Sequence, residues 1–221
     1  MSPSRNCQPR NLRNNLLALP CALLLAFVPC TIAQKPQTLF SVTLNPATTS
    51  VHWTLNTTLH TVHGTFKLKS GVFKIDPATG DASGLIVVDA TSGESGDTAR
   101  DKHMHAAILE SAQYPAITFR PTHIDGNIDL TAAGAVSAQA PLVVHGIFTL
   151  HGQDHPLDIT VNLRPQSSDV PSAVALATHF AVPFVAWGLK DPSTFVLRTD
   201  KQVALDIDAT IVPTFDLARP R

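Results

Sequence analysis

The sequence predicts an all-β domain of about eight antiparallel strands, with one short helix inserted near residues 98–111. Two observations lead to this prediction. Apolar and polar residues alternate with period two through most of the chain after residue 38, as half-buried strands require. Only the run from residue 100 to 119 departs from this pattern and has helical spacing. The fold class is therefore a β-sandwich or a closed β-barrel.

The first 33 residues have the pattern of a secretory signal. Three arginines precede a short apolar stretch at residues 16–28, and residues 31–33 offer a small-residue cleavage site. We expect cleavage near Ala33, which leaves a linker at residues 34–38, a domain at 39–213 and a tail at 214–221. Lipoprotein processing at Cys30 and an uncleaved membrane anchor are the alternatives.

Composition narrows the chemistry of the mature chain. All three cysteines lie within the first thirty residues, so cleavage leaves no disulfide and no thiol. It leaves 13 basic side chains against 17 acidic ones, a net charge of −4. Nucleic acid is therefore not an expected partner, because phosphate binding needs a clustered basic surface.

Four strands are expected before the helix, and their bounds are roughly 40–44, 51–55, 66–75 and 85–90. The apolar positions change from even to odd numbers across Ser70-Gly71, where a glycine bulge would shift the register. Residues 76–80, Asp-Pro-Ala-Thr-Gly, predict a turn.

The helix is expected to begin with a capping box formed by Thr98 and Asp101. The residues that then share one helical face are Met104, Ala107, Ile108 and Ser111. Tyr114-Pro115 is expected to end the helix, because the residue before proline avoids the α conformation.

Five further strands are expected after the helix, around 116–124, 141–150, 157–163, 174–182 and 203–212. Asp206 and Asp208 fall on the outward face of the last one. An eight-stranded barrel has room inside for side chains or for one small ligand.

Large aromatic side chains are available for the interior. They are Trp53, Phe66, Phe73, Phe119, Phe148, Phe180, Phe184, Trp187 and Phe195. They either pack as a solid core or line an elongated pocket for an apolar chain. The apolar loop at residues 182–193 is either a core-filling turn or, as we favour, a lid or plug at one barrel end.

We find no catalytic motif, and no enzyme is expected: nucleophile elbow, phosphate loop and dinucleotide fingerprint are all missing. Three close histidine pairs, 60/63, 103/105 and 151/155, leave open a metal- or haem-binding module. None has a cysteine or glutamate at zinc-site spacing, so we assign no metal ligand. His103 is expected to hold the helix to the barrel through Asp101, or else to contact a polar headgroup.

The run Arg100-Asp101-Lys102-His103, followed across the helix by Tyr114-Pro115 and Thr118-Phe119, resembles the YceI-like family of secreted bacterial lipid-binding proteins. The hairpin Phe148–Gly152 through Pro156-Leu157 is similar as well. The resemblance implies a lipocalin-like β-barrel, a periplasmic location and an interior that holds an isoprenoid such as a polyprenyl phosphate or a quinone. Residues 106–109, Ala-Ala-Ile-Leu, depart from the family, which often has an acid and an aromatic there.

We therefore expect a secreted or periplasmic, non-catalytic binding protein that holds an isoprenoid or other long-chain lipid without a cofactor. Its membrane association is expected to be transient at most, and the protein is a monomer or a homodimer. The expected wall residues are Trp53, Phe66, Phe119, Phe148, Phe180, Phe184 and Trp187, with Arg100 and His103 near the mouth. The alternatives are the histidine-based metal or haem module and a filled barrel that acts as a stress-related interaction domain.

Overall fold

The computed structural model describes residues 38–130, 136–138, 140–165, 173–212 and 214–217. By compactness the chain divides into residues 1–34 and 35–221, and every described residue belongs to the second part. The expected secretory signal at 1–33, and all of the expected linker but its last residue, lie outside the described residues. Within the described ranges, no helix has the length and apolar character needed to cross a bilayer.

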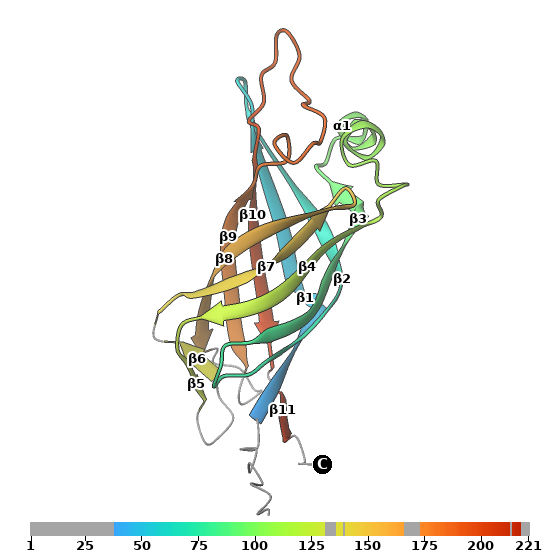
Figure 1. The fold of residues 1–221 in the computed structure, drawn as a ribbon. Coiled ribbons are helices and arrows are strands. Elements are labelled where there is room, and N and C mark those ends of the chain that lie inside the picture. The colour runs from blue at the N-terminus through green and yellow to red at the C-terminus, as the bar shows by residue number, and fades with distance from the viewer. Residues whose placement is uncertain (1–37, 131–135, 139, 166–172, 213, 218–221) are drawn as a thin grey trace, which may run out of the picture. The chain divides into compact units, whose positions relative to one another are not determined.

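Strands make up most of the described chain, as the alternating pattern predicts (Figure 1). They are β1 (Thr38–Asn56), β2 (Thr61–Ile75), β3 (Ala82–Glu94), β4 (Ala116–Asp125), β5 (Ile128–Leu130), β6 (Val136–Ala138), β7 (Leu142–Leu150), β8 (Gln153–Pro165), β9 (Val174–Val182), β10 (Val203–Ile211) and β11 (Thr214–Leu217). The helix α1 (Thr98–His103) continues into a π-helical turn, η1 (Met104–Ile108), between β3 and β4.

Eight strands close into an antiparallel barrel in the order β1-β2-β3-β4-β7-β8-β9-β10, because β10 also pairs with β1. The strand β11 pairs with the first residues of β1, and β5 and β6 form a separate two-stranded sheet. Residues 214–217, which the sequence analysis placed in a tail, are thus part of the main sheet. The all-β barrel with a short helix is confirmed, and the sandwich alternative is wrong.

The period-two pattern directs one set of side chains into the barrel. Val51 lies opposite Ile207 and Trp53 opposite Leu205 across the β1–β10 pair that closes the barrel. Two apolar clusters lie in the interior: one includes Phe40 and lies toward β11, and the other lies toward the helix and the loop after β9. Each large buried side chain stabilises the fold by about 1.5–3 kcal/mol.

Bulges change which residues face inward. The two strands expected at 40–44 and 51–55 form the single strand β1, whose inward positions change from even to odd numbers across a register shift between Leu44 and Val51. The bulge expected at Ser70-Gly71 is found as a register shift between Leu68 and Ser70 against β3. Such bulges bend a strand, which helps a sheet to close on itself.

The helix begins one residue earlier than predicted. Asp97, not Thr98, is the N-cap: its backbone is extended, and its Oδ1 accepts a hydrogen bond from the Arg100 amide at 2.9 Å. That hydrogen bond is the main cause that lowers the pKa of Asp97 below its ordinary value. Asp101 caps nothing in the helix and instead accepts a hydrogen bond from the amide of Ser95 at 2.9 Å.

The predicted end of the helix is also wrong. Regular helical structure stops at Ile108, and Glu110 adopts a left-handed conformation with φ of 45°. A left-handed residue terminates a helix because it turns the next amides away from the helical ladder. Tyr114-Pro115 therefore follows the helix end by several residues.

Candidate binding cavity

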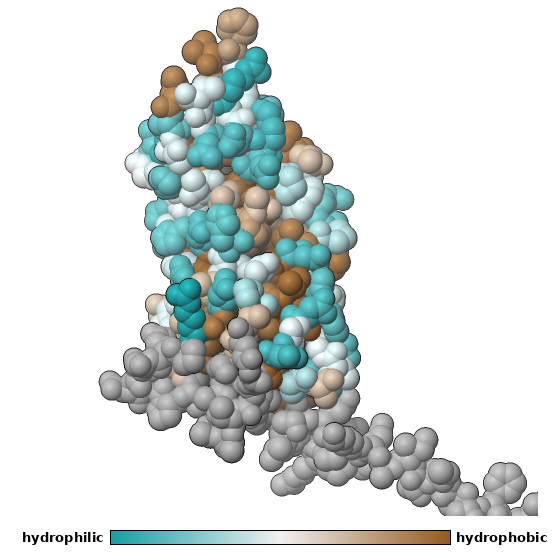
Figure 2. All heavy atoms as spheres, turned by 90° about the vertical axis from the view of Figure 1, so that its left-hand side faces the viewer, coloured by the Kyte–Doolittle hydropathy of each residue, from teal (hydrophilic) through white to brown (hydrophobic). Residues whose placement is uncertain are grey.

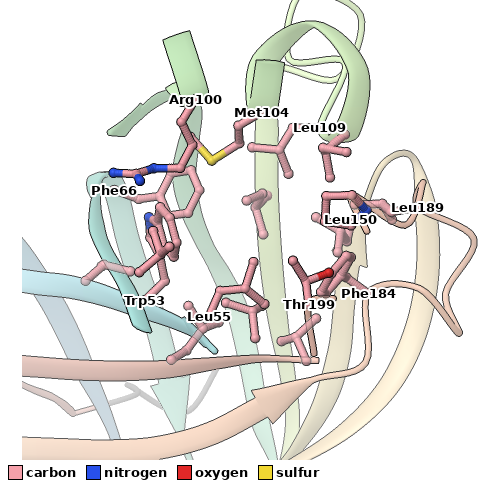
Figure 3. Close-up of a pocket in the computed structure, with 18 of the residues that line it drawn as sticks. Trp53, Leu55, Phe66, Arg100, Met104, Leu109, Leu150, Phe184, Leu189 and Thr199 are labelled. Carbon is pink, nitrogen blue, oxygen red and sulfur yellow. The ribbon is translucent and has the colours of Figure 1, made fainter. Parts of the chain in front are cut away.

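The barrel contains a cavity of about 430 Å³ at the end that carries the helix (Figure 3). Its wall combines strands β1, β2, β9 and β10 with the α1–η1 segment and the loop after β9. The lining is mainly hydrocarbon, and its larger members are Trp53, Leu55, Phe66, Met104, Ile108, Leu109, Phe148, Leu150, Phe180, Phe184, Leu189, Leu197, Leu205 and Ile207. His60 and His103 also line it and are exposed, so the cavity opens to solvent at this end.

A second cavity of about 140 Å³ lies deeper in the barrel. Six side chains line both cavities and therefore lie between them: Val51, Val88, Ile117, Phe148, Phe180 and Ile207. Phe148 and Phe180 make the aromatic part of this partition, packed edge to face with ring centroids 6.4 Å apart. The interior is thus two chambers in line, and the partition residues set the depth of the outer one.

Arg100 and Trp53 bring nitrogen atoms to one side of the outer chamber, and Thr199 lies on the other side (Figure 3). The indole Nε1 of Trp53 is buried and has no hydrogen-bond partner, and the side chain is 5% exposed. Figure 3 shows the guanidinium of Arg100 above Trp53 and Phe66, on the side of the chamber opposite Leu109, Leu150 and Leu189. A buried N–H without an acceptor costs free energy, so this corner favours a ligand that brings an oxygen atom.

The guanidinium of Arg100 is held in place by the residue before the helix. Its Nε donates to Ser95 Oγ at 2.7 Å and its Nη2 to the Ser95 carbonyl at 3.0 Å. The Ser95 hydroxyl in turn donates to Asp101 Oδ1. This arrangement fixes one edge of the guanidinium and leaves its remaining N–H groups available to a ligand.

The helix is attached to the barrel by His105 and not, as expected, by His103. The ring of His105 is hydrogen-bonded to the Gly93 carbonyl at 2.8 Å and to Ser111 Oγ at 3.0 Å. His103 is exposed at the rim of the outer chamber, where it is available to a polar headgroup. The expected hydrogen bond between Asp101 and His103 is absent from the described residues, because Asp101 accepts hydrogen bonds from Ser95.

The loop after β9 covers part of the outer chamber. Phe184 and Leu189 are buried and line it, and the Leu189 amide donates to the Phe184 carbonyl at 3.0 Å. Trp187 lines neither chamber: it stacks on His155 with parallel rings 4.1 Å apart and packs behind Phe148. The expected role of Trp187 as wall is therefore wrong, since the indole supports the wall from behind.

The structure places the remaining predicted site residues as follows. Trp53, Phe66, Phe148, Phe180 and Phe184 line the outer chamber together with Arg100 and His103, whereas Phe119 lines only the deeper one. Phe195, expected inside, is 96% exposed. Leu197, Thr199 and the π-helical turn also line the outer chamber and were not predicted, because irregular backbone carries no periodicity from which to predict orientation.

The histidine pairs do not converge on a metal site. His63 is hydrogen-bonded to Thr54, and His151 to Glu110 at 2.8 Å. A group of titratable side chains lies on the outer wall, where Asp125 and Asp158 flank His145 at 2.9 and 2.7 Å. These hydrogen bonds raise the pKa of His145 above its ordinary value. In the part of the chain that the structure describes, no three His, Cys, Asp or Glu side chains are placed to hold a metal ion.

Comparison with known proteins gives one family. The sequence matches the YceI-like domain over residues 42–211, which is most of the chain. No curated protein matches it significantly.

Three solved structures are similar in fold. A polyisoprenoid-binding domain from Saccharophagus degradans, implicated in plant cell wall breakdown, has a TM-score of 0.57 and 17% identity, over 78% of this chain and 98% of that one. BcnA of Burkholderia cenocepacia has a TM-score of 0.57 and 16% identity, over 76% and 98%. A YceI protein of Campylobacter jejuni has a TM-score of 0.52 and 15% identity, over 70% and 85%. At these identities the likeness concerns the fold.

Proposed function

Because this chain belongs to the YceI-like domain family, we propose that its barrel is a non-catalytic binding protein for an isoprenoid-type lipid. The observation that carries the proposal is the hydrocarbon-lined outer chamber with only a few polar groups in its wall. This is the usual character of a small-molecule site, in which apolar walls give affinity and a few polar groups fix orientation. The open interior also favours a binding role over the filled-barrel alternative.

The size of the chamber sets the length of chain that it accepts. A cavity of about 150 Å³ holds one benzene, so the outer chamber has room for roughly fifteen to eighteen carbon atoms. Three isoprene units have fifteen carbons. At about 0.8 kcal/mol per buried methylene, burying them is worth on the order of 10 kcal/mol before the costs of association. Longer chains would leave their surplus outside the mouth, because the partition separates the outer chamber from the deeper one.

The polar groups of the chamber would orient the ligand. The unpaired Nε1–H of Trp53 and the free N–H groups of Arg100 are donors, and the exposed ring of His103 adds a further N–H. A phosphate or a quinone carbonyl supplies the matching acceptors. A polyprenyl phosphate or a quinone-like molecule therefore fits with its head at this side and its chain along the apolar wall.

The direct test is native mass spectrometry of the purified protein, followed by solvent extraction of any added mass. We expect one bound lipid with an isoprenoid chain, and a Kd for farnesol in the micromolar range or tighter. Leu205→Trp should weaken farnesol binding at least about tenfold, because the indole occupies outer-chamber volume. Val72→Trp, which changes an exposed residue outside the barrel, is the control. A correctly folded protein that binds neither farnesol nor longer isoprenoids and quinones would overturn the proposal.

We also propose that the protein is exported and works in the periplasm or outside the cell, with the first 33 residues removed near Ala33. The basic start, apolar stretch and small-residue site of this segment support export. Intact-mass measurement of the protein from a periplasmic fraction tests it. A mass that still includes the first 33 residues, or recovery only from the cytoplasm, would contradict this proposal without affecting lipid binding.

A further inference from the structure

An exposed apolar tip stands at the open end of the barrel. It consists of Leu59 in the β1–β2 connection and of Phe195 and Val196 in the loop before β10, which are 74%, 96% and 79% exposed. The other exposed large apolar side chains among the described residues are at most 48% exposed. In Figure 2, apolar side chains gather at the upper end of the molecule. Single exposed apolar residues are ordinary, but three at one tip need an explanation.

Backbone hydrogen bonds hold the tip in a defined conformation. The Thr58 amide donates to the Arg198 carbonyl at 2.9 Å, which joins the two loops. Phe195 and Val196 occupy the centre of a tight turn, in which the Thr194 amide donates a hydrogen bond to the Leu197 carbonyl at 2.7 Å. Central turn positions are commonly Gly, Asn, Asp or Ser, so hydrogen bonding here holds two large apolar side chains in water.

The tip continues into the wall of the outer chamber. Thr57 and His60, on either side of the Thr58-Leu59 pair, line the chamber, and so does Leu197 next to Val196. The tip is therefore joined through Leu197 to the wall of the chamber. Whatever the tip contacts is placed at the mouth.

Charge around the tip favours an anionic surface. Arg198 at the base of the turn and nearby Lys190 are exposed, and neither forms an ion pair with another described residue. In the same loop Asp191 accepts from Lys201, whereas Asp200 accepts from the neutral Asn56 Nδ2 at 3.1 Å and keeps its charge. Residues 183–202 thus carry three cationic and two anionic side chains, and this net charge of +1 beside an apolar tip suits anionic lipid headgroups over hydrocarbon.

The area of the tip also favours a bilayer over a protein partner. Three side chains bury on the order of 400 Å², which is about half of what one partner contributes to a stable protein interface. An area of this size is enough for reversible adsorption to a membrane surface, especially with electrostatic attraction.

We propose that the apolar tip inserts into the surface of an anionic lipid bilayer and so places the mouth of the outer chamber against the membrane. The docking depends on the tip alone, and its use for exchange of an isoprenoid between bilayer and barrel rests on the proposed function. Docking of this kind is reversible, because three side chains and a loop charge of +1 give weak adsorption.

Flotation with vesicles of phosphatidylcholine containing about a quarter phosphatidylglycerol tests the docking. The wild-type protein should float with these vesicles and less with pure phosphatidylcholine. The double variant Phe195→Ser, Val196→Ser should lower the partition coefficient roughly tenfold or more. Leu85→Ser, an exposed apolar residue on β3 away from the tip, is the matched control and should change nothing. Equal flotation of tip variant and control, or no flotation of the wild type, would overturn the proposal.

Two further measurements separate the docking from the proposed function. The tip variants should keep the wild-type Kd for farnesol in solution, because neither residue lines a chamber, and should slow transfer of a fluorescent isoprenoid from vesicles to protein. If farnesol never binds while flotation still depends on the tip, the proposed function fails and the docking stands. If farnesol binds but the tip variants float as well as the wild type, the docking proposal fails and the proposed function stands. Leu59→Ser provides a second tip variant should the double variant misfold.

Discussion

Removing one aromatic ring of the partition should shift the binding preference of the barrel toward longer isoprenoids. Phe180 lines both chambers and packs against Phe148, so Phe180→Ala should join the two into one longer space. The deeper chamber, about 140 Å³, has room for roughly five or six carbons, which is one more isoprene unit. Burying those carbons is worth up to about 4 kcal/mol, and ordering the longer chain removes part of this.

The assay is the ratio of Kd values for geranylgeraniol, with twenty carbons, and farnesol, with fifteen. In the wild type the ratio should be near one, because the fourth isoprene unit stays outside the partition. In Phe180→Ala the longer alcohol should bind at least about tenfold tighter than the shorter one. The variant should lose about 3–5 kcal/mol of stability, so circular dichroism must first establish that it is folded.

Phe119→Ala is the matched control. Phe119 lines the deeper chamber alone, so its loss removes a ring of the same size and leaves the partition in place. The Kd ratio should then stay at the wild-type value despite a similar loss of stability. A folded Phe180→Ala protein with an unchanged ratio, or an equal shift in both variants, would refute the idea that the partition limits chain length.

Three further predictions concern the scaffold around the chamber. Gly64→Ala should destabilise the fold by about 1–3 kcal/mol and alter tryptophan fluorescence in thermal unfolding, because its Cβ would lie 2.3 Å from the ring of Trp53. His145→Gln should cost stability below about pH 6.5 and progressively less as the pH rises through the raised pKa of His145, a difference that chemical denaturation across pH measures. Asp191→Asn should speed amide exchange in residues 183–201 at neutral pH. The hydrogen bond from Lys201 is the main cause that lowers the pKa of Asp191, so the Asp191 carboxylate stabilises the loop until strong acid protonates it. The difference in exchange rate between variant and wild type should therefore disappear only in strong acid.

The regular part of the barrel could be predicted from the sequence, because inward and outward residues of a one-sided strand differ in polarity. The strand expected at 174–182 has these bounds in the structure, and Asp208 is exposed on the outer face of β10 as expected. The short strands β5, β6 and β11 were missed, since three or four residues are too few to display a period.

The chamber itself could not be predicted. An inward phenylalanine gives the same pattern whether its ring meets another side chain or faces an open space, so Phe119 and Phe180 were indistinguishable. Loop aromatics were the least predictable: Trp187 supports the wall from behind, and Phe195 points to solvent. Their positions depend on turns held by backbone hydrogen bonds, which composition does not reveal.

The pairing of β11 with the start of β1 determines how the barrel would respond to a pulling force. Thr38 lies opposite Leu217, so a force applied through residues 38 and 217 acts on two neighbouring antiparallel strands at the same end. Their hydrogen bonds would break in sequence, as in a zipper. The break would then pass to the β1–β10 pair at Leu44 and Ile211 and run along that seam toward the helix end. The barrel is therefore mechanically soft along the one seam that joins its first strand to its last two, and stretching would unroll it into a flat sheet.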